Sequence, residues 1–213
     1  MENKTHWNWK EMISPHWLIP AENVYFYIHE WKERKKIVDV GAGVGRHSIL
    51  FARNGYQVTS FDSSESGLQI INERANEESL TIQTVCGDMR VMPFQDCEFD
   101  AVLAFHSIYH ANQEELPIII SELYRILRTG GEVLVTMLSK DDEHFVANKN
   151  HKISDNVVLK RDGKNGPLVP HYYVDYEEIH SLFSKFTILG CQKITEYIQG
   201  HILSHYYIRL RRD

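Results

Sequence analysis

The stretch "IVDVGAGVGRH", residues 37–47, decides the fold. Its first four residues, Ile37–Val40, are mostly apolar and are typical of a buried strand. Glycine then stands at every second position, at Gly41, Gly43 and Gly45. Such glycines let a ligand approach the backbone, and the helix that starts next presents unpaired backbone N–H groups. The stretch therefore predicts a strand, a ligand-binding loop and a helix.

The sequence after this stretch continues to alternate between strands and helices. Further strands are predicted at 57–61, 80–85, 99–105, 132–138, 186–194 and 201–210, and helices at 45–54, after Ser63 or Ser64, at 113–127 and after Asp175. Because strand and helix alternate five times, we expect an α/β fold with a doubly wound, mostly parallel sheet and helices on both faces. The short link between the last two strands predicts an antiparallel C-terminal hairpin, which brings the sheet to seven strands.

The composition is typical of one folded domain, since 43% of the 213 residues are hydrophobic and 24% are charged. The formal net charge of −6 argues against a protein that coats a nucleic-acid duplex. The three cysteines form no CxxC pair, so neither a disulfide framework nor a zinc site is expected. No apolar run resembles a signal peptide or reaches the roughly 20 residues of a membrane span. We therefore expect a cytoplasmic monomer or homodimer with no nucleic-acid partner.

The glycine loop by itself admits more than one interpretation. In a doubly wound sheet, ligands bind beyond the carboxyl ends of the strands, where the strand order reverses. A dinucleotide site would need the spacing GxGxxG, but its third glycine would fall on Arg46. The loop also lacks the lysine of a P-loop. A tight turn that binds nothing is the alternative.

Polar side chains after the next two strands favour a nucleoside. Asp62 ends the second strand, where its carboxylate could accept two hydrogen bonds from a ribose diol or could instead start the next helix. In "GDM", Asp88 could accept from an adenine amino group and Met89 could pack on the ring, although Gly-Asp is also common in turns. Acceptors in three loops after three successive strands are hard to explain by folding alone.

The segments "IVDVGAGVGRHSILFARNGYQVTSFDSS", "CGDMRVMPF", "FDAVLAFHSIYH" and "ELYRILRTGGEVLVTM" together resemble the class I S-adenosylmethionine-dependent methyltransferases. The resemblance covers Ile37 to Met137 in the order and spacing of that family, and the tail "GHILSHYYIRLRR" is also similar. Within that family, the sequence motif "GAGVGRH…ARNGYQV" most resembles those of the small-molecule enzymes of the tellurite-resistance and ubiquinone-biosynthesis kind.

The resemblance implies a Rossmann-like fold, S-adenosyl-L-methionine as the cofactor, and a hairpin beside the fifth strand. It assigns Asp39, Gly41, Ala42 and Gly43 to the methionine part of the cofactor, Gly45 to the helix start, Asp62 to the ribose, Ser63, Asp88 and Met89 to the adenine, and Ala104, Phe105 and His106 to the sulfonium region. It also divides the single domain into an N-terminal helical cap (1–35), a cofactor-binding core (36–138), an insertion or lid (139–174) and a C-terminal helix and hairpin (175–213).

Methyl transfer from a sulfonium is an in-line displacement, for which the protein mainly supplies positioning. A general base helps only where the acceptor atom carries a proton. His106 or His110 could accept that proton and Tyr109 could orient the acceptor, but the two histidines could equally stabilise a loop. Their i, i+4 spacing also occurs in metal sites, yet no third ligand is indicated, so no metal is expected.

Three functions are compatible with these patterns. The first is methyl transfer to a small molecule, favoured by the acidic balance and by the absence of a recognisable RNA-binding domain. The second is methyl transfer to RNA or protein, which would need a basic surface. The third is a non-catalytic module that binds S-adenosylmethionine and regulates a partner.

Overall fold

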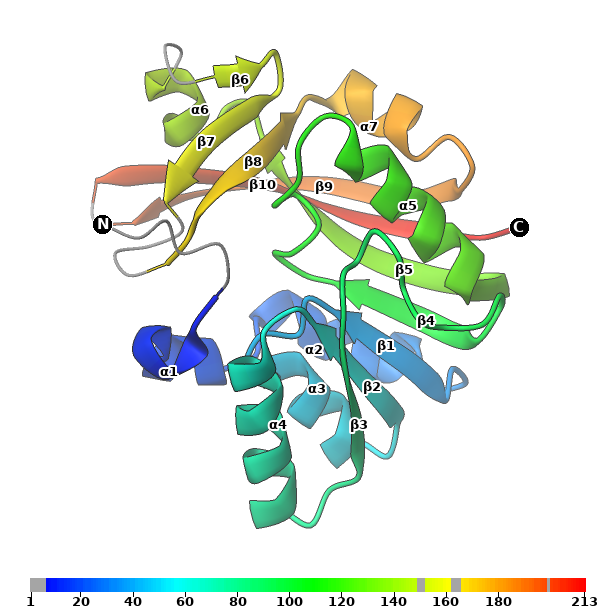
Figure 1. The fold of residues 1–213 in the computed structure, drawn as a ribbon. Helices are drawn as coiled ribbons and strands as arrows, with labels where there is room; N and C mark the ends of the chain where they lie inside the picture. The colour runs from blue at the N-terminus through cyan, green and yellow to red at the C-terminus, as the bar shows by residue number, and fades with distance from the viewer. Residues whose placement is uncertain (1–6, 149–151, 162–165, 199) are drawn as a thin grey trace.

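The computed structural model describes residues 7–148, 152–161, 166–198 and 200–213. Within them, seven strands form the main sheet in the order β3-β2-β1-β4-β5-β10-β9 (Figure 1). These strands are β1 (Lys36–Val40), β2 (Gln57–Asp62), β3 (Ile82–Cys86), β4 (Phe99–Ala104), β5 (Leu127–Ser139), β9 (Thr187–Ile198) and β10 (His201–Arg211). All seven predicted strands are therefore present.

The sheet has the predicted mixture of strand directions. Strands β1 to β5 are parallel, whereas β10 runs antiparallel to both β5 and β9. The C-terminal hairpin thus lies beside the fifth strand, as the resemblance implied. Since β1 has β2 on one side and β4 on the other, the strand order reverses at β1. The carboxyl end of β1 is therefore the place where an open sheet of this kind binds its ligand.

Helices cover both faces of the sheet because side chains alternate along each strand. On one face, Ile37 and Val58 pack with α2 (Glu22–Glu30) and α3 (Arg46–Arg53), and α4 (Glu65–Glu77) extends this layer over β3. On the other face, Val38 and Val102 pack with α5 (Glu115–Ile126), and α7 (Tyr176–Leu182) joins the same cluster. Burial on both faces explains why β1 and β4 are almost continuously apolar.

The insertion at 139–174 contains more regular structure than its turn-rich sequence indicates. It comprises α6 (Glu143–Ala147), β6 (Lys152–Ser154), β7 (Val157–Arg161) and β8 (Leu168–Val174), with residues 149–151 and 162–165 outside the described part. Strand β7 lies between β6 and β8 and runs antiparallel to both. Strand β8 also pairs in parallel with the end of β5, at Leu138 and Ser139. They form the upper left part of the molecule in Figure 1.

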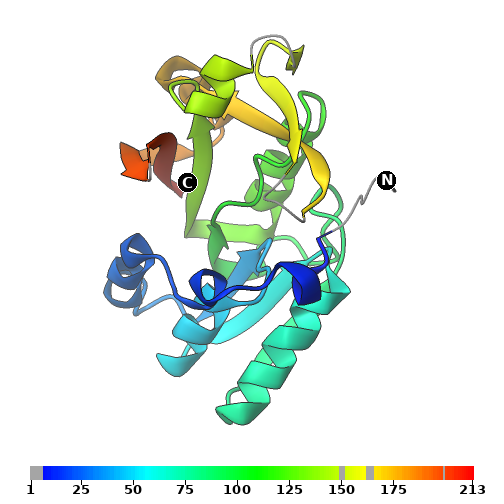
Figure 2. The same cartoon turned by 90° about the vertical axis from the view of Figure 1, so that its left-hand side faces the viewer.

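The N-terminal segment lies across the carboxyl edge of the sheet. It contains α1 (Trp9–Met12) and the 3-10 helix η1 (Pro15–Leu18), and α1 lies against the N-terminal end of α4 (Figure 2). The backbone N–H of Trp9 donates to Ser66 Oγ at 3.0 Å, and the N–H of Ala21 donates to His47 Nε2 at 3.2 Å. These bonds fix the predicted helical cap to α3 and α4; residues 1–6 of the cap lie outside the described residues.

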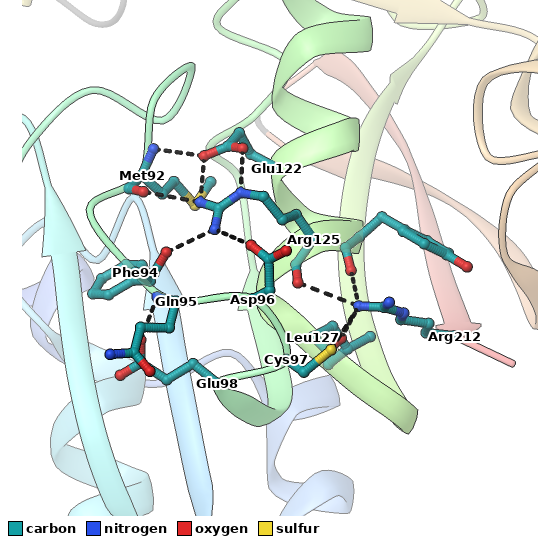
Figure 3. Close-up of polar contacts among 11 residues, drawn as sticks. Met92, Phe94, Gln95, Asp96, Cys97, Glu98, Glu122, Arg125, Leu127 and Arg212 are labelled. Carbon is teal, nitrogen blue, oxygen red and sulfur yellow. Dashed lines mark hydrogen bonds and ion pairs between the residues drawn. The ribbon is translucent and has the colours of Figure 1, made fainter.

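At the opposite edge of the sheet, Arg125 closes the corner between α5 and the loop that precedes β4. Its guanidinium donates to the carbonyl oxygens of Met92 (3.0 Å) and Phe94 (2.7 Å). It also pairs with the carboxylates of Glu122 (2.7 Å) and Asp96 (2.9 Å) (Figure 3). One side chain therefore ties a loop without secondary structure to a helix.

The end of α5 also depends on an arginine, because the helix passes directly into β5. Helix C-termini leave carbonyl groups without partners inside the helix. Here Arg212 Nη1 donates to the carbonyl oxygens of Tyr124 (2.9 Å) and Leu127 (2.6 Å) (Figure 3). The backbone N–H of Cys97 donates to the carbonyl oxygen of Arg125 at 2.9 Å. The helix ends at Ile126, within one residue of the end predicted at 127.

Candidate active site

Two adjoining cavities open at the carboxyl ends of β1, β2 and β4. The larger has an empty volume of about 650 Å³ and the smaller of about 370 Å³, both including space that is open to solvent. The larger is lined by Trp7, Trp9, Trp17, Gly41, Phe61, Asp62, Ser63, Gly87, Met89, His106, Ser107, Tyr109 and His110. The smaller is lined by Trp9, Trp17, Gly41, Ala42, Gly43, Val44, Arg46, His47, Phe105 and His106.

The glycine loop forms the wall between the cavities and the sheet. Gly41 has a φ of +74°, and a Cβ atom there would come within 2.2 Å of Ser107 Cβ in the loop after β4. Gly43 has a φ of +56°, and its Cβ would lie 2.9 Å from Cζ2 of Trp9. A side chain at either position would therefore be both strained and obstructed. These two glycines allow the β4 loop and the N-terminal tryptophan to reach the carboxyl end of β1.

Asp62 lies in the larger cavity at the end of β2. Its Oδ2 accepts from the backbone N–H of Gly43 at 2.8 Å, and its Oδ1 accepts from the N–H of Ser64 at 2.7 Å. Burial raises the pKa of the carboxyl group, and these backbone donors oppose that rise. Each carboxylate oxygen retains a second lone pair, so the group can still accept two hydrogen bonds from a diol.

Asp39 lies beneath the loop and does not line either cavity. Its Oδ2 accepts from Ser48 Oγ at 2.7 Å, and Ser60 Oγ is 2.8 Å from the same hydroxyl. Burial raises the pKa of Asp39 to about 6, although the hydrogen bond from Ser48 and the charge of Arg46 lower it. In this arrangement Asp39 ties β1 to α3, and it is a support for the loop rather than a wall of the cavity.

Of the other predicted cofactor residues, some line one of the two cavities and others line neither. Ser63 and Met89 line the larger cavity, and Ala42, Gly43 and Phe105 line the smaller. Gly45 begins α3 in a left-handed conformation, and Ala104 is fully buried at the end of β4. Asp88 is not brought to either cavity: its half-exposed carboxylate pairs with the guanidinium of Arg90.

His106 lies where the two cavities meet. Its φ of +54° is unusual for a residue with a side chain, and its backbone N–H donates to Thr136 Oγ1 at 2.6 Å. Its Nε2 is buried without a hydrogen-bond partner among the described residues. Burial lowers the pKa of this imidazole well below its ordinary value, so the ring is neutral at pH 7. A strained backbone that holds a neutral, unpartnered imidazole in a cavity is typical of a functional residue.

Further imidazoles and a phenol surround His106. Its ring stacks on that of His205 from β10, with ring centres 4.5 Å apart, and the ring of Tyr109 lies 6.1 Å away. His110 contacts Tyr109 and His171 with ring centres 4.6 and 4.8 Å apart. The N–H of Tyr172 donates to the Tyr109 carbonyl at 2.7 Å, which fixes β8 to this loop.

These imidazoles are poor candidates for a metal site. Burial lowers the pKa of His171 to about 2 and that of His205 to about 4, so both rings are neutral at pH 7. In the described part of the chain, no three His, Cys, Asp or Glu side chains form a group that could hold a metal ion. His106, Tyr109 and His110 of this cluster line the larger cavity, and the rings of His171 and His205 pack against them.

Several lining residues had no assigned role in the sequence analysis. Trp9 is almost fully buried and its Nε1 has no hydrogen-bond partner in the described residues. Ser107, whose Oγ is likewise buried without a partner, follows His106 directly. The density of aromatic residues before the first strand was a signal for the tryptophans, but no motif marked Ser107 or Arg46.

Comparison with known proteins gives a consistent result. Residues 37–131 match the family described as "Methyltransferase domain". A probable S-adenosyl-L-methionine-dependent methyltransferase TehB from Haemophilus influenzae is 32% identical over 108 residues, which are 50% of this chain and 37% of that protein. A sterol 24-C-methyltransferase from Gibberella zeae is 31% identical over 62% of this chain and 35% of its own length. The matched region thus spans little more than a third of these relatives.

Solved structures share the fold over most of the chain. A SAM-dependent methyltransferase from Methanosarcina mazei has a TM-score of 0.76 and 19% identity, covering 92% of this chain and 99% of its own. A 1,6-didemethyltoxoflavin-N1-methyltransferase from Burkholderia thailandensis, with bound S-adenosylhomocysteine, has a TM-score of 0.68 and 16% identity over 90% and 78% of the two chains. At these identities the likeness establishes the fold. In the described residues no helix is long and apolar enough to cross a membrane.

Proposed function

We propose that the protein is a class I S-adenosylmethionine-dependent methyltransferase that transfers a methyl group from S-adenosylmethionine to a small-molecule acceptor. The match of residues 37–131 to the methyltransferase domain supports this proposal. The observation that carries this proposal is the composition of the larger cavity. The segments that follow β2 and β3 supply Asp62, Ser63 and Met89, and the loop after β4 supplies His106, Tyr109 and His110; β2 and β4 lie on opposite sides of β1. A nucleoside and a second molecule would therefore meet in one enclosed space.

The residues present fit the cofactor. Asp62 can accept from a ribose diol, and the Met89 side chain can pack on a purine ring. The buried, unpartnered polar atoms of Trp9 and Ser107 lie on residues that line the same cavity, and a polar ligand would satisfy them. When bound, the cofactor supplies an activated methyl group, so the chain itself needs only to bind, orient and exclude water.

The opposite wall would bind the acceptor. The neutral imidazole of His106 can accept a proton at Nε2 from an acceptor hydroxyl or ammonium group. Tyr109 and His110 are placed to orient the acceptor, since both line the cavity beside His106. The tryptophans of the N-terminal segment cover this space and would keep water from the reacting groups.

A small acceptor is supported by the shape of the site and by the relatives. The larger cavity is a concave space with mostly aromatic and small side chains in its wall, and among the similar proteins are methyltransferases named for a sterol and for didemethyltoxoflavin. The net charge of −6 gives no support to an RNA acceptor.

The first test is binding, measured as a thermal shift with S-adenosylmethionine, S-adenosylhomocysteine and NAD in separate samples. We expect the first two compounds to raise the melting temperature and NAD to leave it unchanged. Stabilisation by NAD alone would refute the proposal that S-adenosylmethionine is the cofactor. A screen with radiolabelled cofactor over thiols, amines, phenols, carboxylates and metalloid oxyanions then identifies the acceptor. Cofactor binding without transfer to any of them would favour a regulatory module, and RNA binding with a steep salt dependence would favour a macromolecular acceptor.

The acceptor side is tested by turnover with the best acceptor from that screen. His106→Ala and His110→Ala should lower the turnover while the affinity for S-adenosylhomocysteine stays nearly unchanged. His180→Ala is the matched control, because this histidine is exposed on α7, away from the cavity. Normal turnover in His106→Ala would assign that residue a structural role.

A further inference from the structure

The imidazole of His106 is held in one orientation by the residues around it. Its ring stacks with two others, those of Phe105 and His205, whose centres each lie 4.5 Å away at interplanar angles of 22° and 13°. The hydrogen bond from its backbone N–H to Thr136 Oγ1 fixes the main chain at the same position. Because His205 comes from β10, these contacts join the loop after β4 to the C-terminal hairpin. The fold therefore orients the ring before any ligand binds.

Within the described residues, Nε2 of this imidazole is buried and has no hydrogen-bond partner. Burial keeps the pKa of the ring well below its ordinary value, so the ring is neutral at pH 7. In the tautomer that carries its proton on Nδ1, a neutral imidazole accepts a hydrogen bond at Nε2. A ligand that brings an O–H or N–H group would satisfy this buried acceptor.

Aromatic rings form the wall of the larger cavity around His106. Trp7 contacts His110 with ring centres 5.0 Å apart, and His110 contacts Tyr109 with ring centres 4.6 Å apart. The ring of Tyr109 lies 6.1 Å from that of His106. All four residues line the cavity, so a ligand that donates to Nε2 would lie among these rings. Such surroundings favour an aromatic ligand, because rings pack on one another face to face or edge to face.

The charges of the cavity wall favour an acceptor without a charge of its own. Among the described residues that line the larger cavity there is no lysine or arginine, and Asp62 is the only carboxylate. The guanidinium of Arg46 belongs to the smaller cavity, where it contacts the rings of Trp17 and Phe105. An anionic acceptor would therefore lose its hydration without gaining a cationic side chain, which costs free energy.

We propose that the methyl acceptor is a neutral aromatic molecule whose O–H or N–H group donates a hydrogen bond to Nε2 of His106. The inference rests on the proposed function, because it names the acceptor class of that reaction. During transfer the acceptor's oxygen or nitrogen forms a bond to the methyl carbon, and the bond from that carbon to sulfur breaks with its electron pair left on sulfur. The proton passes to Nε2 and then to solvent. A weakly basic imidazole suffices, because a methylated oxygen or nitrogen that still carries this proton is a strong acid.

The test measures binding, by ligand-observed NMR, to the full-length protein saturated with sinefungin, a cofactor analogue with a positively charged amine in place of the sulfonium. The probes are phenol, anisole, cyclohexanol and benzoate. We expect anisole to bind about 10-fold more weakly than phenol, because it brings no donor to Nε2. Cyclohexanol should bind about 2- to 10-fold more weakly because it cannot stack, and benzoate about 10-fold more weakly because its charge gains no cationic side chain. Indole and 1-methylindole repeat the first comparison for an N–H donor.

His106→Phe separates the hydrogen bond from the shape of the site. This variant keeps a flat ring against Phe105 and His205 but lacks the acceptor atom, so it should bind phenol and anisole about equally. His180→Phe is the matched control, because His180 is exposed on α7, and it should keep the wild-type preference. Saturation with sinefungin shows that each variant is folded. His106→Asn is the second variant should His106→Phe not fold, because asparagine tolerates the positive φ and its shorter side chain does not reach the position of Nε2.

A preference for the donor in either pair that is lost on substitution of His106 supports the inference. A preference that persists in the variant, or no preference in the wild type, overturns it. Cyclohexanol or benzoate binding as tightly as phenol overturns it as well. In each of these cases the binding of sinefungin leaves the proposed function intact. A wild type that binds neither sinefungin nor S-adenosylhomocysteine refutes the proposed function itself.

Discussion

Arg46 and Arg125 are both arginines of helices in the same core, yet their surroundings are opposite. Arg125, at the corner away from the cavities, donates to two backbone carbonyls and pairs with two carboxylates (Figure 3). Arg46, in the smaller cavity, contacts the rings of Trp17 and Phe105 and makes no polar bond to any described residue. One guanidinium is bound by hydrogen bonds and ion pairs, and the other is held by contacts with aromatic rings.

The same difference extends to the residues around each arginine. At the corner, even the carbonyl groups left over at the end of α5 find a donor in Arg212. In the cavities, buried polar atoms of His106 and Ser107 have no partner in the described residues, and His106 has a strained backbone. The corner also has Arg212 Nε without a partner among the residues described, and a positive φ at Cys97. The difference is that the unpartnered atoms of Trp9, His106 and Ser107 belong to residues that line one cavity, where a single polar ligand could satisfy them together.

The largest effect that we expect is on stability at the corner. Arg125→Ala removes charge-assisted hydrogen bonds to Met92, Phe94 and Glu122, so the free energy of unfolding should fall by about 2–3 kcal/mol. Urea denaturation measures this change. The dissociation constant of S-adenosylhomocysteine should stay the same, since no cavity residue contacts Arg125. A variant with wild-type stability would show that the corner does not hold the fold.

The next effect is on binding. Asp62→Ala should weaken the affinity for S-adenosylhomocysteine by about 1–3 kcal/mol, because the ribose hydroxyls would lose their acceptors. Titration calorimetry of the wild type and the variant gives this change in binding free energy directly. Asp96→Ala is the control, since this aspartate is exposed at the Arg125 corner and should leave the affinity unchanged.

Asp62 also holds the backbone of Gly43 and Ser64, so its removal lowers stability as well. Measurement of the affinity well below the melting temperature of the variant separates the two effects. An Asp62→Ala protein that melts earlier but binds S-adenosylhomocysteine normally would move Asp62 from the site to the scaffold.

The features predicted correctly from the sequence are those encoded by residues close together in the chain. The helix predicted after Asp175 is α7, and its start is fixed by local hydrogen bonds between Asp175 and Glu178 at 2.9 and 3.0 Å. The first strand, its glycine loop and α3 also follow from one short stretch. Helical and strand periodicity, together with the handedness of parallel connections, then leave few arrangements of the sheet.

The features that were not predicted depend on contacts between distant parts of the chain. Trp9 fills the space above Gly43 and Gly67 because α1 packs on α4, and no periodicity in 1–35 encodes that contact. The strands β7 and β8 are obscured by the turn residues between them. The ion pair between Asp88 and Arg90 was not predicted either, and the assignment of Asp88 to the adenine stays a prediction. The cofactor contacts of the other site residues stay predictions until a complex is examined.

A smaller effect on the free energy of unfolding is expected when the pH is lowered. The pKa of His205 is lowered from 6.5 to about 4 by burial, with the nearby Lys160 acting in the same direction and Asp142 opposing it. Between pH 6.5 and 4 the unfolded chain therefore binds a proton at this position that the folded chain does not. Stability falls as the pH falls through this window, by about 1–2 kcal/mol at pH 5 from this residue.

Asp39 acts in the opposite direction, since its pKa is raised to about 6 and its protonation favours the folded state as the pH falls. Asp39 is present in both the wild type and His205→Gln, so its contribution cancels when the pH dependence of the two proteins is compared. Urea denaturation at pH 7 and pH 5 should show that the variant loses about 1–2 kcal/mol less than the wild type between the two values. Equal losses would mean that His205 is protonated in the folded protein.

The smallest expected effect makes the comparison of the two arginines sharpest. Arg46→Met keeps the apolar stem between Trp17 and Phe105, gives up weak cation–π attraction and removes the cost of a half-buried charge without a polar partner. These terms oppose each other, so the free energy of unfolding should change by less than about 0.5 kcal/mol, against the 2–3 kcal/mol expected for Arg125→Ala. Urea denaturation of both variants in one buffer makes the measurement. A loss in Arg46→Met as large as that in Arg125→Ala would mean that Arg46 supports the fold as Arg125 does. Ring contacts would then stabilise this core as much as hydrogen bonds and ion pairs do, and the two arginines would no longer differ in what they contribute to the fold.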